Sequence, residues 1–295
     1  MRMRMTAIWR VAVTAGLAVP VLAAAQSQAP VFRTGTEAVI IDVAVLAGNK
    51  PVAGLTVGDF EVTDNGVPQA IVDLTRETMP IDISLIVDTS GSVRGPLFNA
   101  LRGAIDDVAT RIAPADTMRL VQFSERVGVG NAMSPQPGQK ISTQLRVPDG
   151  YTSLLDAIAM GLITEPRPGR REMAIVLTDG WDTTSIVSED AVVELAKRSN
   201  AAVFAVALVT TSTSVPAHEK LLRAVTGLSG GRLAVLPRGQ DLSKAFVQAL
   251  DDFRTSYVVR YEPRGVERRG WHDVEIHVRN KPNYSVRARK GYVGG

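Results

Sequence analysis

The sequence contains no cysteine and only three histidines among its 295 residues. Without cysteine, disulfide bonds, thiolate nucleophiles, zinc–thiolate sites and a lipidated N-terminal cysteine are all excluded. The H-E-x-x-H metal helix, the Walker phosphate loop and a G-x-G-x-x-G loop after a strand are missing as well. The chain therefore carries none of these common signatures of zinc proteases, nucleotide-binding enzymes and dinucleotide-dependent enzymes.

An excess of charge of one sign is also lacking once the N-terminus is set aside. The formal net charge of +3 comes from 33 basic and 30 acidic side chains, and three of the basic ones are arginines in the first ten residues. The remainder is balanced, so the charge gives no support for nucleic-acid binding. Residues 254–295 keep a local surplus of ten basic over four acidic side chains, which we interpret as solvated faces of strands.

The first 25 residues have the pattern of a secretory signal peptide. Arginines precede the mostly apolar run Val11–Ala25, which ends in small residues, and Ala23 and Ala25 have the spacing of a cleavage site. The run holds 15 residues, fewer than the roughly 20 that a membrane-spanning helix needs. We therefore expect cleavage after residues 1–25 rather than a retained anchor, giving a secreted or periplasmic protein without a stable membrane span.

Three segments are expected after the signal peptide: a β segment at 26–79, an α/β domain at 80–253 and a second β segment at 254–295. In the first β segment, "DNG" at 64–66 is a strong hairpin signal between two strand-like runs. The second alternates apolar and polar residues and ends in one strand-like run, "YSVRARKGYV", at 284–293. Neither segment has enough strands for a stable sheet alone, so we expect the two to pair into a small β-sandwich.

Between residues 80 and 253, short apolar strands alternate about five times with helical patterns. Runs such as "AIVL" and "VFAVALV" are apolar throughout, as expected for strands that are buried on both faces. The fold class is therefore α/β, with a doubly wound, mostly parallel sheet that is flanked by the paired β segments. The expected strands are 81–87, 118–123, 172–178, 201–209 and 231–236, and the expected helices are 96–112, 153–162, 188–199, 216–227 and 241–253.

Oxygen donors gather beside three of these strands. Asp88, Ser90 and Ser92 follow the first strand, Thr152 lies just before a helix, and Asp179 follows the strand that contains "AIVL". Ligands of an open α/β sheet collect at the carboxyl ends of its strands. Two carboxylates with several hydroxyls suit a hard divalent cation such as Mg²⁺, which prefers oxygen ligands and keeps some water. Because only two carboxylates are present, a bound cation could still accept an anionic ligand from another molecule.

The run "DTSGS" resembles the D-x-S-x-S motif of the von Willebrand factor A (VWA) domain, which is part of its metal-ion-dependent adhesion site. The resemblance assigns Asp88, Ser90 and Ser92 to this motif, Thr152 in "GYTSL" to the family threonine and Asp179 in "LTDG" to its second aspartate. The residue before Thr152 is a tyrosine, where the family more often has glycine.

This resemblance implies that the five side chains hold Mg²⁺, or Mn²⁺ or Ca²⁺ in its place. It also implies a non-enzymatic role in cell adhesion or as a scaffold, in which an Asp or Glu of a partner protein completes the coordination of the cation. The flanking β segments are similar to those of exported VWA-related proteins common in Acidobacteria. The resemblance thus covers nearly all of the chain after the signal peptide.

Three more side chains are candidates for the surroundings of the site or for contact with a partner. Asp182 is placed to hold the Asp179 loop, Trp181 to contact a partner as an exposed aromatic anchor, and Asp156 to support Thr152 from one helical turn away. Each also has an ordinary structural interpretation: a free loop residue, an aromatic side chain packed on the sheet edge, and a solvated helix residue.

Two other functions remain open, a metal-dependent hydrolase and a structural envelope protein with a vestigial site. "GLSGG" at 227–231 satisfies the G-x-S-x-G pattern of serine hydrolases, but it follows a helix and precedes a strand, whereas the nucleophile needs the order strand, turn, helix. Its glycines are better explained as a helix C-cap and a turn. Because a site made mainly of hydroxyls lacks an evident base to deprotonate water, we expect no enzymatic activity.

Overall fold

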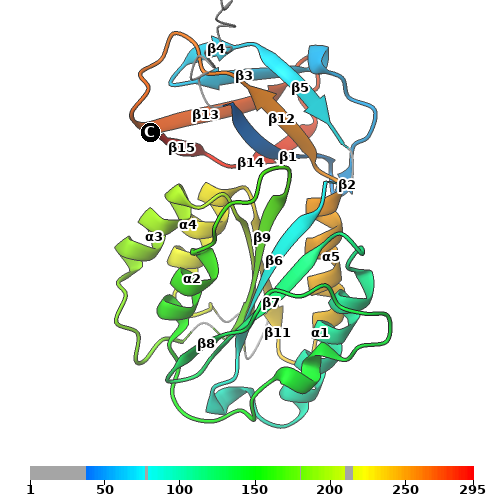
Figure 1. Ribbon diagram of the computed structural model, residues 1–295, viewed down its shortest axis with the longest axis vertical. Helices are drawn as coiled ribbons and strands as arrows, with labels where there is room; N and C mark the ends of the chain where they lie inside the picture. The colour runs from blue at the N-terminus through cyan, green and yellow to red at the C-terminus, as the bar shows by residue number, and fades with distance from the viewer. Residues whose placement is uncertain (1–37, 77–78, 180, 210–214) are drawn as a thin grey trace, which may run out of the picture. The chain divides into compact units, whose positions relative to one another are not determined.

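The computed structural model describes residues 38–76, 79–179, 181–209 and 215–295. The predicted signal peptide and its cleavage site lie outside these ranges. Within them, no helix is both long and apolar enough to cross a membrane. The described chain forms a six-stranded sheet with helices on both faces and two antiparallel sheets made from its terminal β segments (Figure 1), which confirms the predicted fold class.

The strands of the larger sheet are β6 (Ile81–Asp88), β7 (Thr117–Phe123), β8 (Val127–Val129), β9 (Arg171–Thr178), β10 (Ala202–Val209) and β11 (Arg232–Pro237). Their order is β11-β10-β9-β6-β7-β8, and all neighbours are parallel except β7 and β8. Every residue of β9 and β10 is buried, because helices cover both faces. The short antiparallel edge strand β8 was not predicted.

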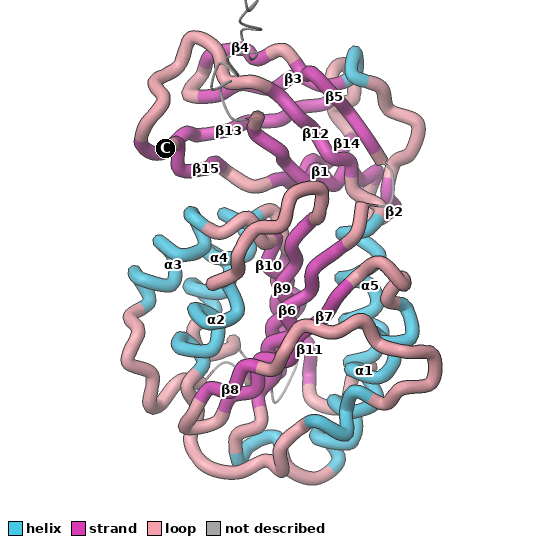
Figure 2. The backbone as a smooth tube through the Cα atoms, in the orientation of Figure 1, coloured by secondary structure: helices cyan, strands magenta, loops and turns pink. Residues whose placement is uncertain are grey.

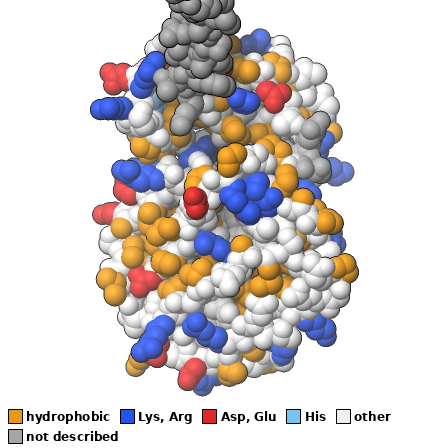
Figure 3. Space-filling view, in the orientation of Figure 1, with side chains coloured by type: hydrophobic (Ala, Val, Ile, Leu, Met, Phe, Trp, Pro, Cys, Tyr) orange, Lys and Arg blue, Asp and Glu red, His pale blue; other side chains and the backbone are white. Residues whose placement is uncertain are grey.

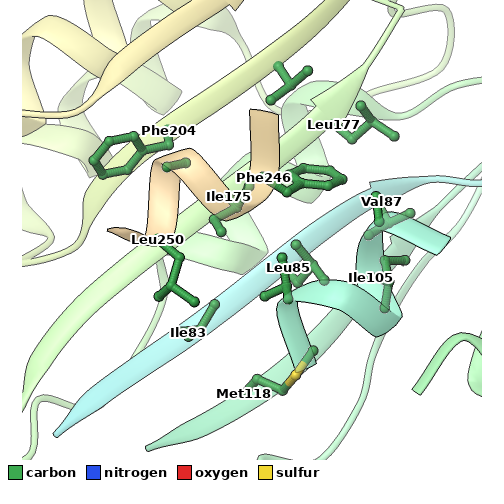
Figure 4. Close-up of a cluster of buried hydrophobic side chains, with 14 of the residues drawn as sticks. Ile83, Leu85, Val87, Ile105, Met118, Ile175, Leu177, Phe204, Phe246 and Leu250 are labelled. Atoms are coloured by element: carbon green, nitrogen blue, oxygen red, sulfur yellow. The ribbon is translucent and has the colours of Figure 1, made fainter. Parts of the chain in front are cut away.

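The helices beside this sheet are α1 (Pro96–Arg111), α2 (Leu154–Leu162), α3 (Glu189–Arg198), α4 (Glu219–Ser229) and α5 (Leu242–Arg254). Helices α1 and α5 cover one face, and α2, α3 and α4 cover the other. Alternation along β6 separates the two cores, since Ile83, Leu85 and Val87 pack with α1 and α5 whereas Ile86 packs with α2. Figure 4 shows the first of these cores, with Phe246 of α5 lying among the strand side chains.

The two β segments pair with each other in two antiparallel sheets (Figure 2). Their strands are β1 (Val39–Ala47), β2 (Lys50–Pro51), β3 (Phe60–Asp64), β4 (Val67–Gln69), β5 (Ile71–Thr75), β12 (Tyr257–Tyr261), β13 (Gly270–Val278), β14 (Tyr284–Ala288) and β15 (Gly291–Gly294). One sheet has the order β14-β1-β12-β5, with β2 beside β1, and the other has the order β15-β13-β3-β4. Each sheet thus combines strands from both segments, as predicted, and Ile41, Phe60 and Tyr261 belong to their shared core.

Strands β14 and β15 lie in different sheets, so the prediction of one strand over 284–293 is wrong. The break falls at Arg289, whose side chain is buried. Its guanidinium donates hydrogen bonds to the carbonyl oxygens of Lys197 (3.2 Å), Ser199 (3.0 Å) and Gly291 (2.7 Å). The first two are acceptors at the C-terminal end of α3, where backbone carbonyls lack helical partners. The strand β14 therefore ends just before Arg289, whose side chain hydrogen-bonds to the end of α3.

The two ends of the α/β domain meet at the buried side chain of Asp116. Its Oδ1 accepts a hydrogen bond from the N–H of Ile81 at the start of β6 (2.8 Å), and its Oδ2 accepts one from Arg254 at the end of α5 (2.7 Å). Nearby, Arg171 at the start of β9 pairs with Asp42 of β1 (2.6 Å). Because β6 and β9 are parallel, their starts lie toward the sandwich and their carboxyl ends lie at the opposite edge of the sheet.

The surface carries charges of both signs, as the balanced composition predicts. On the face shown in Figure 3, Lys and Arg side chains are scattered among hydrophobic and uncharged ones, together with Asp and Glu. Pairs such as Glu219 with Arg223 and Glu194 with Lys197 place opposite charges one turn apart on a helix. Such mixed surfaces are typical of folded domains in water.

Gly230, the residue after α4, lies against the backbone of the C-terminal segment. Its φ is +82°, and a Cβ there would be 2.6 Å from the N of Arg289 and 2.8 Å from the carbonyl carbon of Ala288. Gly239 has a similar φ of +90°, but its Cβ would meet nothing within 4 Å, so it provides a matched control.

We expect Gly230→Ala to lower the free energy of unfolding by about 2–5 kcal/mol and Gly239→Ala by only about 1–2 kcal/mol. Both substitutions strain a left-handed backbone, but only the first adds a clash with another segment. Urea denaturation of the two variants measures the difference, and equal losses would contradict the proposed close packing.

Candidate metal centre

Asp88 is the last residue of β6, and its side chain is fully buried at the carboxyl edge of the sheet. Its Oδ1 accepts a hydrogen bond from the N–H of Ser90 at 2.8 Å, whereas its buried Oδ2 has no hydrogen-bond partner among the described residues. Burial raises the pKa of Asp88 to about 7; hydrogen bonds from Ser90 oppose this rise, and the negative charge of Asp179 adds to it. An unpaired buried carboxylate oxygen is costly, and a cation would satisfy it.

The two serines of the motif lie in the turn directly after Asp88. Ser90 precedes a short 3-10 helix, Gly91–Val93, which contains Ser92, and the two hydroxyl oxygens are 3.1 Å apart. Helix α1 begins only at Pro96, after a residue with positive φ, Gly95. The backbone N–H groups closest in sequence to these hydroxyls therefore belong to the 3-10 turn rather than to α1.

Thr152 lies on a second loop, and backbone hydrogen bonds join this loop to the first. The N–H of Gly91 donates to the carbonyl oxygen of Gly150 at 3.1 Å, and the N–H of Asp149 donates to that of Thr89 at 3.0 Å. The side chain of Thr152 is buried. Main-chain hydrogen bonds thus hold the loop of Thr152 beside the loop of Ser90 and Ser92.

Asp179 follows β9 on a third loop, which is joined to the second. The N–H groups of Thr183 and Thr184 donate to the carbonyl oxygen of Thr152 at 2.8 and 3.1 Å. The side chain of Asp179 is 3% exposed, and its Oδ2 accepts a hydrogen bond from the guanidinium of Arg238 at 3.2 Å. Hydrogen bonds therefore connect all three loops that carry the five predicted ligands.

The three predicted neighbours of the site have different environments. Asp182 accepts a hydrogen bond from the N–H of Leu155 in α2 (3.2 Å), and Asp156 of the same helix accepts one from the N–H of Val187 (2.8 Å). These two carboxylates fasten the loop after β9 to the first turn of α2. The Trp181 side chain is instead 64% exposed.

The donor set has the chemistry of a hard-cation site. No group of three or more His, Asp and Glu side chains suited to a metal occurs in the described parts of the chain. The predicted ligands instead combine two carboxylates with three hydroxyls, which suits Mg²⁺ and leaves room for water. Oδ2 of Asp88 has no hydrogen-bond partner among the described residues, so it is free to contact a cation. The residues present therefore fit a divalent cation.

Residues 82–233 match the family model for the von Willebrand factor type A domain. The chain belongs to this family. The match begins at the second residue of β6 and extends into β11, so it lies inside the segment 80–253 that the sequence predicts as the VWA domain. VWA domains are generally protein-interaction modules, are usually non-enzymatic, and commonly bind a divalent metal at a metal-ion-dependent adhesion site.

Solved structures resemble this chain at low sequence identity. A von Willebrand factor type A protein from Catenulispora acidiphila is 13% identical, with 79% of this chain and 73% of that chain covered and a TM-score of 0.50. The PilB minor pilin from Streptococcus sanguinis is 16% identical (61% and 63% covered, TM-score 0.48), and proximal thread matrix protein 1 from the mussel byssus is 14% identical (64% and 49% covered, TM-score 0.49). This chain spans less than two thirds of the last two. No curated protein sequence matches significantly.

Sequence reasoning missed Arg238, although its guanidinium contacts a predicted ligand. The only signal was its position: it directly follows β11, a strand parallel to β10, so it lies at the same edge of the sheet as the loops after β6 and β9. It also missed Thr183 and Thr184, whose N–H groups hold the loop of Thr152. Their hydroxyls contribute as well, since Thr183 accepts a hydrogen bond from the N–H of Thr152 (3.0 Å) and Thr184 donates one to its carbonyl oxygen (3.2 Å).

Ser229 of the G-x-S-x-G pattern has a structural role. It is the last residue of α4, and its buried hydroxyl accepts a hydrogen bond from the N–H of Val203 (2.9 Å) and donates one to the carbonyl oxygen of Thr226 (3.3 Å). Gly230 is the left-handed C-cap. The predicted cap and turn are thus present, but the helix ends two residues beyond Gly227, where the sequence pattern ended it.

Proposed function

We propose that this VWA protein is an exported adhesion or scaffold module that binds a partner protein through a divalent cation. The observation that carries the proposal is the unpaired, buried Oδ2 of Asp88, which lies close enough to Asp179 for the two charges to interact. Three hydrogen-bonded loops hold these carboxylates at the edge of the sheet, with hydroxyl donors on two of the loops. The general role of VWA domains in protein interaction supports the proposed binding of a partner protein.

Asp88, Ser90, Ser92, Thr152 and Asp179 are the residues that would hold Mg²⁺, or Mn²⁺ or Ca²⁺ in its place. When bound, the cation supplies a coordination position that an Asp or Glu of the partner fills. Four of the five side chains are buried and Ser92 is exposed; the bonds between the loops hold most of the donors in advance, which lowers the ordering cost when the ion enters.

Two exposed aromatic side chains adjoin the proposed ligands in sequence. Tyr151 precedes Thr152 and is 65% exposed, and Trp181 follows Asp179 by two residues and is 64% exposed. Large aromatic side chains contribute strongly to protein interfaces when a partner covers them. We assign both to the partner-contacting surface around the cation.

We expect a cation-dependent partner to be captured by the immobilised protein from an envelope extract in Mg²⁺, and to be lost when EDTA replaces Mg²⁺. An Asp179→Ala bait should retain at least about tenfold less, because removing one ligand weakens the site. Asp73→Ala removes an exposed carboxylate of β5 and should capture as the unmodified protein does. Calorimetric titration with Mg²⁺ is the companion measurement: no heat with the unmodified protein, together with EDTA-resistant capture, would leave the site vestigial and the proposal wrong.

A further inference from the structure

Arg238 is held at the proposed metal centre from a fourth strand end. It directly follows β11, and its backbone N–H donates to the carbonyl oxygen of Val209 at the end of β10 (2.8 Å). Its guanidinium lies 3.2 Å from Oδ2 of Asp179. The arginine side chain is 41% exposed, whereas that of Asp179 is 3% exposed. A partly exposed cation thus contacts a buried carboxylate.

The charges at this edge are only partly compensated. Asp88 and Asp179 are two buried carboxylates at the carboxyl edge of the sheet. Among the described residues, Arg238 is the cation that forms an ion pair with either of them, and it reaches only Asp179. Oδ2 of Asp88 stays unpaired. One positive charge is therefore present for two carboxylates.

We propose that Arg238 is a tethered counter-ion that competes with the divalent cation for Asp179. It neutralises this carboxylate when no metal is bound, and it gives up Oδ2 when a metal enters. Its positive charge also opposes the approach of the cation, since like charges a few ångströms apart repel at a site of reduced dielectric. Arg238 thereby lowers the cation affinity and keeps the loop after β9 in place without metal. This inference rests on the proposed metal function.

Calorimetric titration of Arg238→Gln with Mg²⁺ tests the competition. We expect the Kd for Mg²⁺ to fall about tenfold relative to the unmodified protein, because one unit charge beside the site is removed. Arg94→Gln is the matched control: Arg94 pairs with Asp149 and donates to the carbonyl oxygen of Pro148 on the second loop, so it has no contact with Asp179. Its Kd should change less than about twofold. Arg238→Lys keeps the charge and should stay close to the unmodified protein.

Thermal unfolding gives a second, independent readout. In EDTA, Arg238→Gln should melt at a lower temperature than the unmodified protein, because Asp179 has lost its partner. In saturating Mg²⁺ the difference should shrink, so the metal-induced rise in Tm is larger in the variant. The Arg94→Gln protein should show the same rise as the unmodified protein.

The outcomes separate this inference from the metal function itself. If the unmodified protein binds Mg²⁺ and Arg238→Gln binds it equally or more weakly, the counter-ion inference is wrong and the metal site stands. An equal gain in Arg94→Gln or Arg238→Lys would also overturn it, since the effect would then not depend on the contact with Asp179 or on the charge. If neither the unmodified protein nor Arg238→Gln binds Mg²⁺ at all, both proposals fail.

Discussion

Replacing Asp88 with asparagine is expected to weaken Mg²⁺ binding by more than about a hundredfold while making the metal-free protein more stable at neutral pH. Asparagine keeps an oxygen that can accept the hydrogen bond from Ser90, but it removes the buried negative charge. The substitution therefore separates two roles of this side chain. The negative charge is needed to hold a cation, but in the metal-free protein it lowers the stability of the fold.

The pH dependence follows from the pKa of about 7 that burial imposes on Asp88. The folded protein holds this proton more tightly than the unfolded chain, in which an aspartate titrates near 3.9. The contribution of Asp88 to the free energy of unfolding is therefore fully present below about pH 4. It is lost as the pH rises toward 7, by up to about 4 kcal/mol. Asp88→Asn stays neutral and should not show this loss.

Urea denaturation in EDTA at about pH 5 and pH 8 measures the effect, and calorimetry measures Mg²⁺ binding. Asp149→Asn is the control, because Asp149 lies on the second loop with an 80% exposed side chain and is not a proposed ligand. The same pH dependence in Asp88→Asn and in the unmodified protein would show that Asp88 does not carry an uncompensated charge.

The second large effect is expected in the β-sandwich, at Asp64. This fully buried carboxylate pairs with Nδ1 of His272 (2.7 Å) and accepts hydrogen bonds from the hydroxyls of Tyr261 (3.0 Å) and Tyr292 (2.8 Å). Burial raises the pKa of both tyrosines, and the negative charge of Asp64 adds to this, so both hydroxyls stay protonated donors at ordinary pH. One acid therefore satisfies the buried side chains of Tyr261 on β12 and His272 on β13 and the half-buried side chain of Tyr292 on β15.

Asp64→Ala is expected to lower the free energy of unfolding by about 3–5 kcal/mol, because it leaves these buried groups without their partner. The control Asp73→Ala removes an exposed carboxylate from β5 and should cost less than about 0.5 kcal/mol. Urea denaturation followed by tryptophan fluorescence compares the two, with Trp271 on β13 reporting on the sandwich. A loss below about 1 kcal/mol for Asp64→Ala would mean that the cluster is not a central support of the sandwich.

The sequence allowed prediction of those features that depend on local pattern. Asp88 follows a strand whose apolar residues are visible as a run, so its place at a sheet edge could be inferred. Asn65 and Gly66 form the predicted hairpin between β3 and β4, and both have positive φ. The helix predicted to begin near residue 188 is α3, and Ser188 caps it by accepting a hydrogen bond from the N–H of Ala191.

Features that depend on distant contacts could not be predicted in this way. Arg238 meets Asp179 across 59 positions of sequence, and a single arginine after a proline gives no local signal of that meeting. The final strand pattern is interrupted at Arg289 because this side chain satisfies carbonyl groups of α3, which the alternation of residues does not encode. The edge strand β8 is three residues long, too short to show a period.

The position of Asp116 has a consequence for the order in which the molecule is assembled. Val39 and Tyr261 are neighbours across β1 and β12, yet 222 positions of chain separate them, and closing so long a loop directly is entropically unfavourable and slow. Once the central domain has formed, the same carboxylate secures Ile81 and Arg254, so both arms leave from one anchor. We therefore expect the sandwich to close after the central domain has folded, because that domain brings the two β segments together.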